Sequence, residues 1–293
     1  MAVYTNTSPN AVNKNVIIPE VYAELVNEKI AGHVVVIQAA DVLGNLEGQP
    51  GETLNLPAWV YIGDATDVTV GQAMTTNSLQ QSVRSATIKM VAAPGIAVND
   101  YDNEVALGRA LEKAAEMQGI SIARKQDTDI IAAAYQTPLK LALANDDRVT
   151  FTEMNLALGK FGDDANADDF AFIAIHSIFV PSFLSMDGFV DATQTFNKDG
   201  NGIQLNNLLG YFRGIPVVVT DRLYDTATTE AYMLFIKKHA LAFIPKESVF
   251  VEASRNAAKR ETDMFTSQYY ACALVDDTGV CLAKKTLPTQ PSI

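Results

Sequence analysis

The side chains that most often carry out chemistry are scattered along this sequence and do not gather in a known motif. Its 293 residues contain no glycine-rich nucleotide loop, no Gly-x-Ser-x-Gly nucleophile turn and no His-Glu-x-x-His zinc helix. The histidines, His33, His176 and His239, have no cysteine or carboxylate at metal-ligand spacing. We therefore predict no catalytic residue, no cofactor and no metal centre, and we interpret the histidines as packing or surface residues.

Two polar stretches resemble the opening of a calcium-binding loop. Asp164, Asn166 and Asp168 match its first three ligand positions, but the twelfth position holds no glutamate. A second stretch, Asn197–Gly202, fails at the same position. Asp, Asn and Gly are also the usual residues of turns, so we interpret both stretches as turns, with adventitious cation binding as the alternative.

A basic cluster, Lys237, Lys238 and His239, lies between two predicted strands. A solvated hairpin turn is the simplest interpretation. The alternative is a contact with a phosphate or with a carboxylate of another subunit.

The cysteines and the apolar runs predict a soluble chain made in the cytosol. Cys272 and Cys281 are too few for a disulfide framework and are interpreted as reduced packing residues. No apolar segment for secretion is present at the N-terminus. The longest apolar run, Phe170–Leu184, is interrupted by His176 and Pro181 and is too short to cross a bilayer.

The charge of the chain limits what it can bind. It carries 22 basic and 34 acidic side chains, a formal net charge of −12, and 48% hydrophobic residues, enough for a substantial core. An acidic surface does not hold nucleic acid by counterion release. Direct sequence readout of DNA is therefore not expected.

The longest predicted element is a helix over Asn99–Tyr135, a long segment without proline. Asn99 offers an oxygen for its N-terminus, and apolar residues recur at three- and four-residue steps over Leu107–Ile122. Gly119 and Asp127 are the positions where we expect an interruption. A helix of this length usually supports something extended.

A second predicted feature is a long ribbon of two strands. Two alternating runs indicate its strands: Leu54, Leu56, Ala58, Val60 and Ile62, then Ala86, Ile88, Met90 and Ala92. The polar tip between them, Gly63–Gln81, exceeds the usual length of a hairpin loop, and such loops are usually functional.

The remaining elements are shorter and segregate by type, which favours an α+β fold. We predict helices from Pro19 and over Thr152–Phe161 and Ser177–Met186, strands over Val34–Ile37, Phe170–Ile175, Ile215–Thr220, Ala231–Ile236, Ala240–Ile244 and Val249–Ala253, and a hairpin over Tyr269–Ala283.

Four segments carry a family resemblance: IIPEVYAELVNEKI, GYFRGIPVVVTDRL, AYMLFIKKHALAFI and YYACALVDDTGVCLAKK. With the ribbon and the long helix they make Val16–Lys285 similar to the major capsid proteins of tailed bacteriophages, which have the Hong Kong 97-type fold. The resemblance implies an N-terminal arm and short helix (1–47), an extended loop (48–92), a peripheral domain with a spine helix (93–150), an axial domain (151–245) and a return to the peripheral domain with a C-terminal tail (246–293).

The resemblance also implies a function. Such subunits assemble into pentamers and hexamers and then into an icosahedral shell that encloses double-stranded DNA without sequence-specific binding. The expected partners are further copies of the chain, a portal, and a scaffolding or decoration protein where one is used, with no membrane. The expected location is the virion, after assembly in the cytoplasm of a bacterial host. No lysine stands in the ribbon tip, so a covalent cross-link there is not expected.

The predicted assembly contacts follow from residue type, because aromatic residues and arginine concentrate in interfaces. They are Trp59, Tyr61, Arg84, Lys89, Lys237 and Lys238. Packing of Trp59 on its own subunit is the alternative.

Two other functions stay open at this point. A nanocompartment shell of the encapsulin type would share the fold and enclose protein cargo. An oligomeric α+β enzyme would need polar groups with perturbed pKa values converging in one pocket.

Overall fold

The computed structural model describes residues 19–42, 53–59, 62–101 except 64, 66, 70, 72 and 75, 110–146, 148–162, 166–191 and 207–287. The fold is α+β, as the sequence predicts. The described residues form two compact units. Unit 1 is built from the chain up to Gly32, Met90–Ala123 and Ser248–Gln268, and unit 2 from His33–Lys89, Arg124–Glu247 and the chain from Tyr269 onward.

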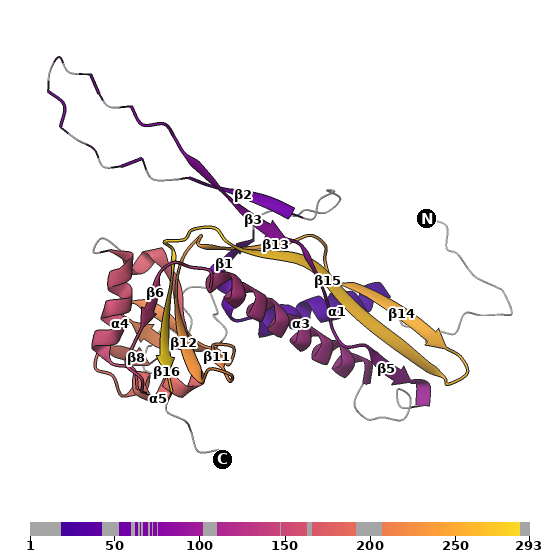
Figure 1. Cartoon of the computed structure of the whole chain (residues 1–293). Coiled ribbons are helices and arrows are strands. Elements are labelled where there is room, and N and C mark those ends of the chain that lie inside the picture. Colours follow the sequence, from indigo (N-terminus) through magenta and orange to yellow (C-terminus); the bar gives the residue numbers. More distant parts are fainter. Residues whose placement is uncertain are drawn as a thin grey trace, which may run out of the picture. The chain divides into compact units, whose positions relative to one another are not determined.

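The helices and strands are labelled in Figure 1. The α-helices are α1 (Pro19–His33), α3 (Ala110–Ala134), α4 (Phe151–Leu158) and α5 (Val180–Leu184), with 3-10 turns η1 (Val36–Ala39), η2 (Gly159–Phe161), η3 (Ala167–Asp169) and η4 (Ser177–Phe179). The strands are β1 (Ala40–Val42), β2 (Thr53–Trp59), β3 (Gln81–Thr87), β4 (Lys89–Ala92), β5 (Ile96–Asn99), β6 (Lys140–Ala142), β7 (Phe170–Ile175), β8 (Phe189–Asp191), β9 (Leu208–Phe212), β10 (Ile215–Val219), β11 (Tyr224–Asp225), β12 (Glu230–Lys237), β13 (Leu241–Pro245), β14 (Phe250–Asn256), β15 (Glu261–Leu274) and β16 (Val280–Thr286).

Unit 1 depends on a close approach of two helices. A Cβ atom at Gly119 in α3 would lie 2.8 Å from the Cβ of Lys29 and 3.2 Å from the carbonyl oxygen of Val26, both in α1. Glycine at this position therefore allows the contact between α1 and α3. The helix continues through it without a break.

A buried amide completes unit 1. Gln118 accepts hydrogen bonds from the hydroxyls of Tyr22 (2.8 Å) and Thr266 (2.7 Å) and donates to the carbonyl oxygens of Pro94 (3.1 Å) and Met264 (3.2 Å). Every polar atom of this side chain has a partner, so its burial carries no unpaired group. Near this site, β5 and β14 both pair antiparallel with the first half of β15.

The centre of unit 2 is an eight-stranded sheet with the order β6-β16-β12-β7-β10-β9-β8, and β11 pairs with β12. Successive side chains along its strands point alternately into two hydrophobic clusters. Leu234 and Leu282 belong to the cluster that includes η1 and the last turns of α3, whereas Phe235 and Cys281 belong to the cluster that includes α4 and α5. The central strands are covered on both faces, which explains their nearly continuous apolar sequences.

The ribbon of β2 and β3 also belongs to unit 2 (Figure 1). The two strands pair antiparallel, as the sequence predicts. The register runs from Thr53 with Thr87 to Trp59 with Gln81, so Gln81 lies in β3 and not in the predicted tip. Leu56 and Ala86 are buried in a small cluster that includes alanines of β13 and β15. Among the ribbon side chains that the structure describes, those at the base are therefore anchored in the subunit by apolar contacts.

Only the first residues at the start of the predicted long helix are described. Asn99 ends strand β5, and its side chain accepts a hydrogen bond from the backbone N–H of Tyr101, which is the oxygen contact expected at the helix N-terminus. Asp100 and Tyr101 are helical, residues 102–109 lie outside the described part, and α3 ends at Ala134. The expected interruption at Asp127 is also wrong, because this carboxylate is used elsewhere: it accepts hydrogen bonds from three consecutive backbone N–H groups, residues 35 to 37.

Several strand predictions were also wrong. Val34–Ile37 was expected as a strand, but Val36–Ala39 forms the 3-10 turn η1, because the Asp127 carboxylate binds its backbone. The expected hairpin of Tyr269–Ala283 does not form: β15 pairs with β13 and β14, while β16 pairs with β12 and β6. Local alternation cannot reveal such a change of sheet.

The second ribbon strand is also shorter than expected. Alternation holds through Ala86 and stops at Ile88, after which Val91 is buried and Met90 and Ala92 are exposed. The segment β4 pairs with β15 instead. In α1, Tyr22, Val26 and Ile30 are buried, whereas Val21 is exposed.

Gly119→Ala should destabilise the protein although alanine is the better helix former. The propensity gain of about 1 kcal/mol is outweighed by the clash with α1, since overpacking costs about 1–3 kcal/mol. We expect a lower urea midpoint with an unchanged slope. The matched control is Gly159→Ala, where a Cβ meets nothing within 4 Å. Equal stability of both variants would contradict the close helix contact.

Candidate assembly surface and buried charge network

The base of the ribbon is held by ion pairs. Arg84 of β3 pairs with Asp277, and the Lys89 ammonium lies 3.6 Å from the Asp129 carboxylate. Asp129 is only 5% exposed and also binds Lys125 at 2.9 Å and the Tyr270 hydroxyl at 2.8 Å. Burial raises the pKa of Asp129, but the hydrogen bonds from Lys125 and Tyr270 and the charge of Lys89 outweigh it and hold the pKa below its ordinary value.

These pairs place two of the residues predicted for assembly. Arg84 and Lys89 have carboxylate partners within their own subunit, although their side chains remain 43% and 58% exposed. They therefore position the ribbon whether or not they also contact a neighbour. Trp59 ends β2 opposite Gln81, and its side chain lies outside the described part, as does Tyr61.

Beyond its base, the described ribbon exposes apolar side chains. They are Ile62, Val68, Met74, Leu79 and Val83, each between 55% and 75% exposed. Apolar groups gathered on one protruding element mark an interaction surface more often than an ordinary solvated loop. The sequence analysis noted the polar residues of this tip and missed its apolar ones.

The basic cluster at Lys237–His239 forms a turn, but not a hairpin. It connects β12 to β13, which pair with different strands. Lys237 lies over the rings of Phe161 and Phe170, 5.2 and 5.9 Å from their centroids. Its neighbours line a cleft: Lys238 and His239, with Asp41, which lies 2.5 Å from His239, and Asp168.

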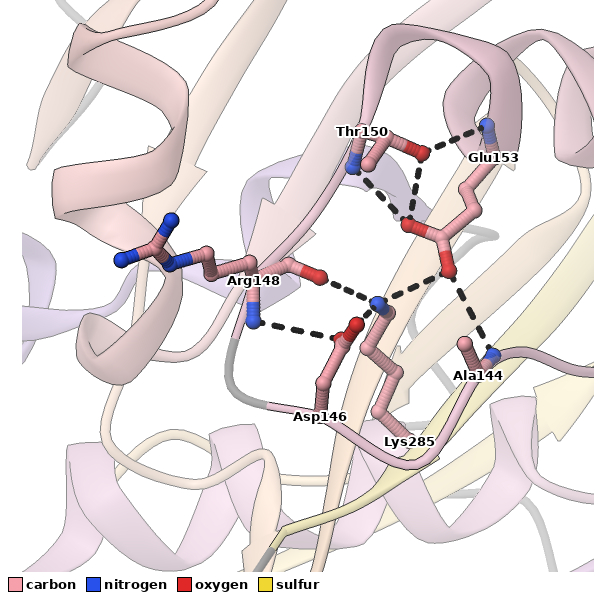
Figure 2. A network of polar contacts seen from close by, with 6 residues as sticks. All are labelled: Ala144, Asp146, Arg148, Thr150, Glu153 and Lys285. Atoms are coloured by element: carbon pink, nitrogen blue, oxygen red, sulfur yellow. Dashed lines mark hydrogen bonds and ion pairs between the residues drawn. The ribbon is translucent and has the colours of Figure 1, made fainter.

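The most enclosed charge in the described chain is Lys285, whose side chain is 0% exposed (Figure 2). Its ammonium lies 2.6 Å from Oδ1 of Asp146 and 2.8 Å from Oε1 of Glu153. It also donates to the carbonyl oxygen of Arg148. Two carboxylates and one backbone carbonyl thus surround one ammonium, as burial of a charge requires.

Glu153 has a second role at the start of α4. Its carboxylate accepts from the Thr150 N–H (2.8 Å) and hydroxyl (2.9 Å), and the Thr150 hydroxyl accepts from the Glu153 N–H (3.4 Å), which is a capping box (Figure 2). Burial raises the pKa of Glu153, but the bonds from Lys285 and Thr150 outweigh it and keep the pKa below its ordinary value. This carboxylate is therefore ionised at neutral pH.

The network was not predicted, although the sequence contains two signals of it. Thr150 followed three residues later by Glu153 is the capping-box pattern. In β16, Cys281, Ala283 and Lys285 share one strand face by the two-residue period. A lysine on an apolar face predicts a buried charge with partners, but no local rule names Asp146.

His176 and the two cysteines are further side chains with potential reactivity inside the described chain. His176 is buried, accepts a hydrogen bond from the Ile178 N–H at 3.2 Å, and has its pKa lowered by burial. Cys272 and Cys281 are free thiols, and burial raises their pKa values to about 12 and about 11, which leaves both unreactive at neutral pH.

Within the described residues, no group of three or more histidine, cysteine or carboxylate side chains is placed to hold a metal ion. In the first calcium-like stretch, Asn166 caps η3, while residues 163–165 and the second stretch up to residue 202 lie outside the described part. None of the described helices is long and apolar enough to span a membrane.

Comparisons with known proteins agree with this architecture. No family model matches the chain. Over 272 residues it is 28% identical to the major capsid protein of Staphylococcus phage phiMR11, covering 92% of this chain and 94% of that protein.

Solved structures share the fold at low sequence identity. One is the capsid structure of the cyanophage P-SCSP1u, with 13% identity, a TM-score of 0.60 and coverage of 88% and 89% of the two chains. Another is a virus-like particle from Pyrococcus furiosus, with 9% identity, a TM-score of 0.58 and coverage of 90% and 98%. The fold is therefore that of Hong Kong 97-type shell proteins.

Removing the buried ammonium should lower the free energy of unfolding far more than removing an exposed one. Lys285→Met leaves two carboxylates facing each other and should lower the free energy of unfolding by about 3 kcal/mol. The matched control, Lys284→Met, removes the neighbouring lysine, which is 46% exposed and paired with Glu230. It should cost less than about 1 kcal/mol. Urea unfolding measures both, and similar losses would show that Lys285 is not enclosed.

Proposed function

We infer that this chain, which has the Hong Kong 97-type fold and resembles a phage major capsid protein over nearly its whole length, is a structural subunit of a bacteriophage shell. The relative with 28% identity favours a phage shell over a nanocompartment. In this proposal the chain acts by binding further copies of itself and catalyses no reaction.

The observation that carries this proposal is the ribbon. A two-stranded hairpin is marginal in water by itself. Among the described ribbon residues, Leu56 and Ala86 at the base are buried in the subunit, while apolar side chains farther along, such as Val83 and Met74, are exposed. A neighbouring copy that covers these side chains supplies the missing burial.

The finer features of assembly follow as part of the same proposal. Copies of the chain form pentamers and hexamers that close into an icosahedral shell around double-stranded DNA, with a portal and with scaffolding or decoration proteins where these are used. The net charge of −12 suits a wall that contains DNA without holding it. Residues 48–92 act as the extended loop, 93–150 and 246–293 form the peripheral domain, and 151–245 form the axial domain.

Particle size and contents test the function directly. We expect the purified chain, or the chain co-expressed with its neighbouring phage genes, to give closed particles or rings of uniform diameter by electron microscopy and light scattering. Particles from infected cells should contain DNA that nuclease removes only after the shell is opened. A stable monomer under every condition contradicts the shell role, and protein cargo in place of DNA supports the nanocompartment alternative.

The ribbon is tested by a charge on its exposed apolar side. Val83 is 61% exposed, so Val83→Glu should change the free energy of unfolding of the subunit by no more than about 0.5 kcal/mol. It should abolish assembly, because the charge would have to be buried without a partner at the interface. Val83→Thr, which keeps the shape without the charge, is the control and should assemble.

Trp59→Ala tests the predicted aromatic contact separately. Loss of assembly with an unchanged unfolding curve is expected, because aromatic anchors commonly contribute about 2 kcal/mol or more to an interface. Trp59→Phe should retain part of the assembly. If Trp59→Ala unfolds the subunit, the tryptophan packs on its own body instead.

A further inference from the structure

Lys285 combines two properties that rarely occur together in a lysine. Its side chain is completely enclosed, and its ammonium touches the side-chain oxygens of two different carboxylates. It follows Cys281 and Ala283 on the face of β16 that packs into the cluster of α4 and α5. In an ordinary surface ion pair, by contrast, the ammonium stays in contact with water.

We propose that Lys285 and Asp146 condense into an amide, so that the folded chain carries an intramolecular isopeptide bond, with Glu153 transferring the protons. The inference concerns one subunit by itself and does not rest on the proposed shell function.

The geometry brings the reacting groups into contact. The Lys285 nitrogen lies 2.6 Å from Oδ1 of Asp146, which places it beside the carboxyl group whose Cγ it would attack. Two groups held together in this way react as an intramolecular pair. The Arg148 carbonyl and Oε1 of Glu153 accept the other two N–H bonds and fix the direction of the nitrogen. Figure 2 shows the three oxygens converging on the ammonium.

Glu153 is placed to carry protons. It lies 2.8 Å from the Lys285 nitrogen, is 12% exposed, and is held by Thr150 at its other oxygen. An ionised carboxylate at this distance is within reach for general base catalysis. Asp146 is 49% exposed, so the water released from its carboxyl group has a path to solvent.

The environment also favours the product. Removing an ammonium from water costs several kcal/mol, of which its attraction to a carboxylate returns only a part, whereas Asp146 itself stays 49% exposed. The amide is neutral and keeps an N–H donor and a carbonyl acceptor at the same place. Condensation therefore replaces an ion pair at an enclosed nitrogen by a group that costs less to bury.

The step balances without any further reactant. Glu153 takes one proton from the ammonium and passes it to the Asp146 carboxylate. The nitrogen lone pair is then free to attack Cγ of the neutral carboxyl group. The new C–N bond forms, the nitrogen gives up its second proton through Glu153, and one Asp146 oxygen leaves as water. Ammonium and carboxylate thus become amide and water, with no oxidation or reduction.

The bond would link positions 139 residues apart. It would tie β16 to the segment before α4 within unit 2. A covalent closure of so long a loop restricts the unfolded chain, as a disulfide does, and so raises stability.

Intact-mass spectrometry of the denatured full-length protein tests the inference. The wild-type chain should be lighter than its sequence mass by one water, and proteolysis should release a branched peptide that joins the Asp146 and Lys285 segments. Lys285→Arg should match its own sequence mass and give only linear peptides. A wild-type chain of full mass overturns the inference, as does a water loss without the branched peptide, because an aspartate can also close on its own backbone.

Two variants test the assigned roles. Asp146→Asn should lose one ammonia in place of one water, since the nitrogen would displace the amide group. Glu153→Gln should show the unmodified mass in most molecules, and a folded Glu153→Gln that is fully cross-linked would remove Glu153 from the reaction. If Glu153→Gln does not fold, the wild-type mass and its branched peptide still decide the question.

Discussion

The path of the chain through unit 2 depends on one buried carboxylate. Asp127, in the middle of α3, accepts hydrogen bonds from the backbone N–H groups of Val35 (3.0 Å), Val36 (3.0 Å) and Ile37 (3.1 Å). Three consecutive N–H groups without intrahelical partners need an acceptor when they are buried. The carboxylate supplies it, and the chain turns through η1 into β1, which pairs parallel with β13.

The same principle recurs wherever this chain buries a polar group. Gln118 in unit 1 and Lys285 in unit 2 both lie among apolar neighbours, and each makes three or more polar contacts. Among the described residues, no buried side-chain nitrogen or oxygen lacks a partner. The polar side chains of each unit are therefore satisfied internally. Apolar side chains stay exposed at several places, and those of the ribbon lie on one element that association with further copies can bury.

Local patterns predicted the elements well where one physical rule decides them. The pairing of the two ribbon strands follows from their alternating residues, and α4 begins at Phe151 because the capping box of Thr150 and Glu153 is encoded within four residues. The α+β class and the Hong Kong 97-type fold also followed from the sequence, and the solved structures confirm the fold.

Long-range partners explain the failures. Val34–Ile37 has a strand composition, but a carboxylate 91 positions away turns its backbone into η1. Tyr269–Ala283 looks like a hairpin, yet its two strands join different sheets. Gly119 looked like a helix break and is a contact surface for α1. The partners of Lys285 were equally out of reach, because the spacing of Asp146 and Lys285 follows no local period.

Hydrogen exchange of the unassembled and assembled protein tests the central claim most directly, namely that neighbouring copies stabilise the ribbon, whereas the core helices and sheets are stable within the subunit. Backbone amides in α3 should exchange slowly in both states, because their protection arises within the subunit. Amides of β2, β3 and the tip should exchange fast in the free subunit and slow down by orders of magnitude on assembly. Equal protection of the ribbon in both states, or an α3 that becomes protected only in the assembly, would contradict the account.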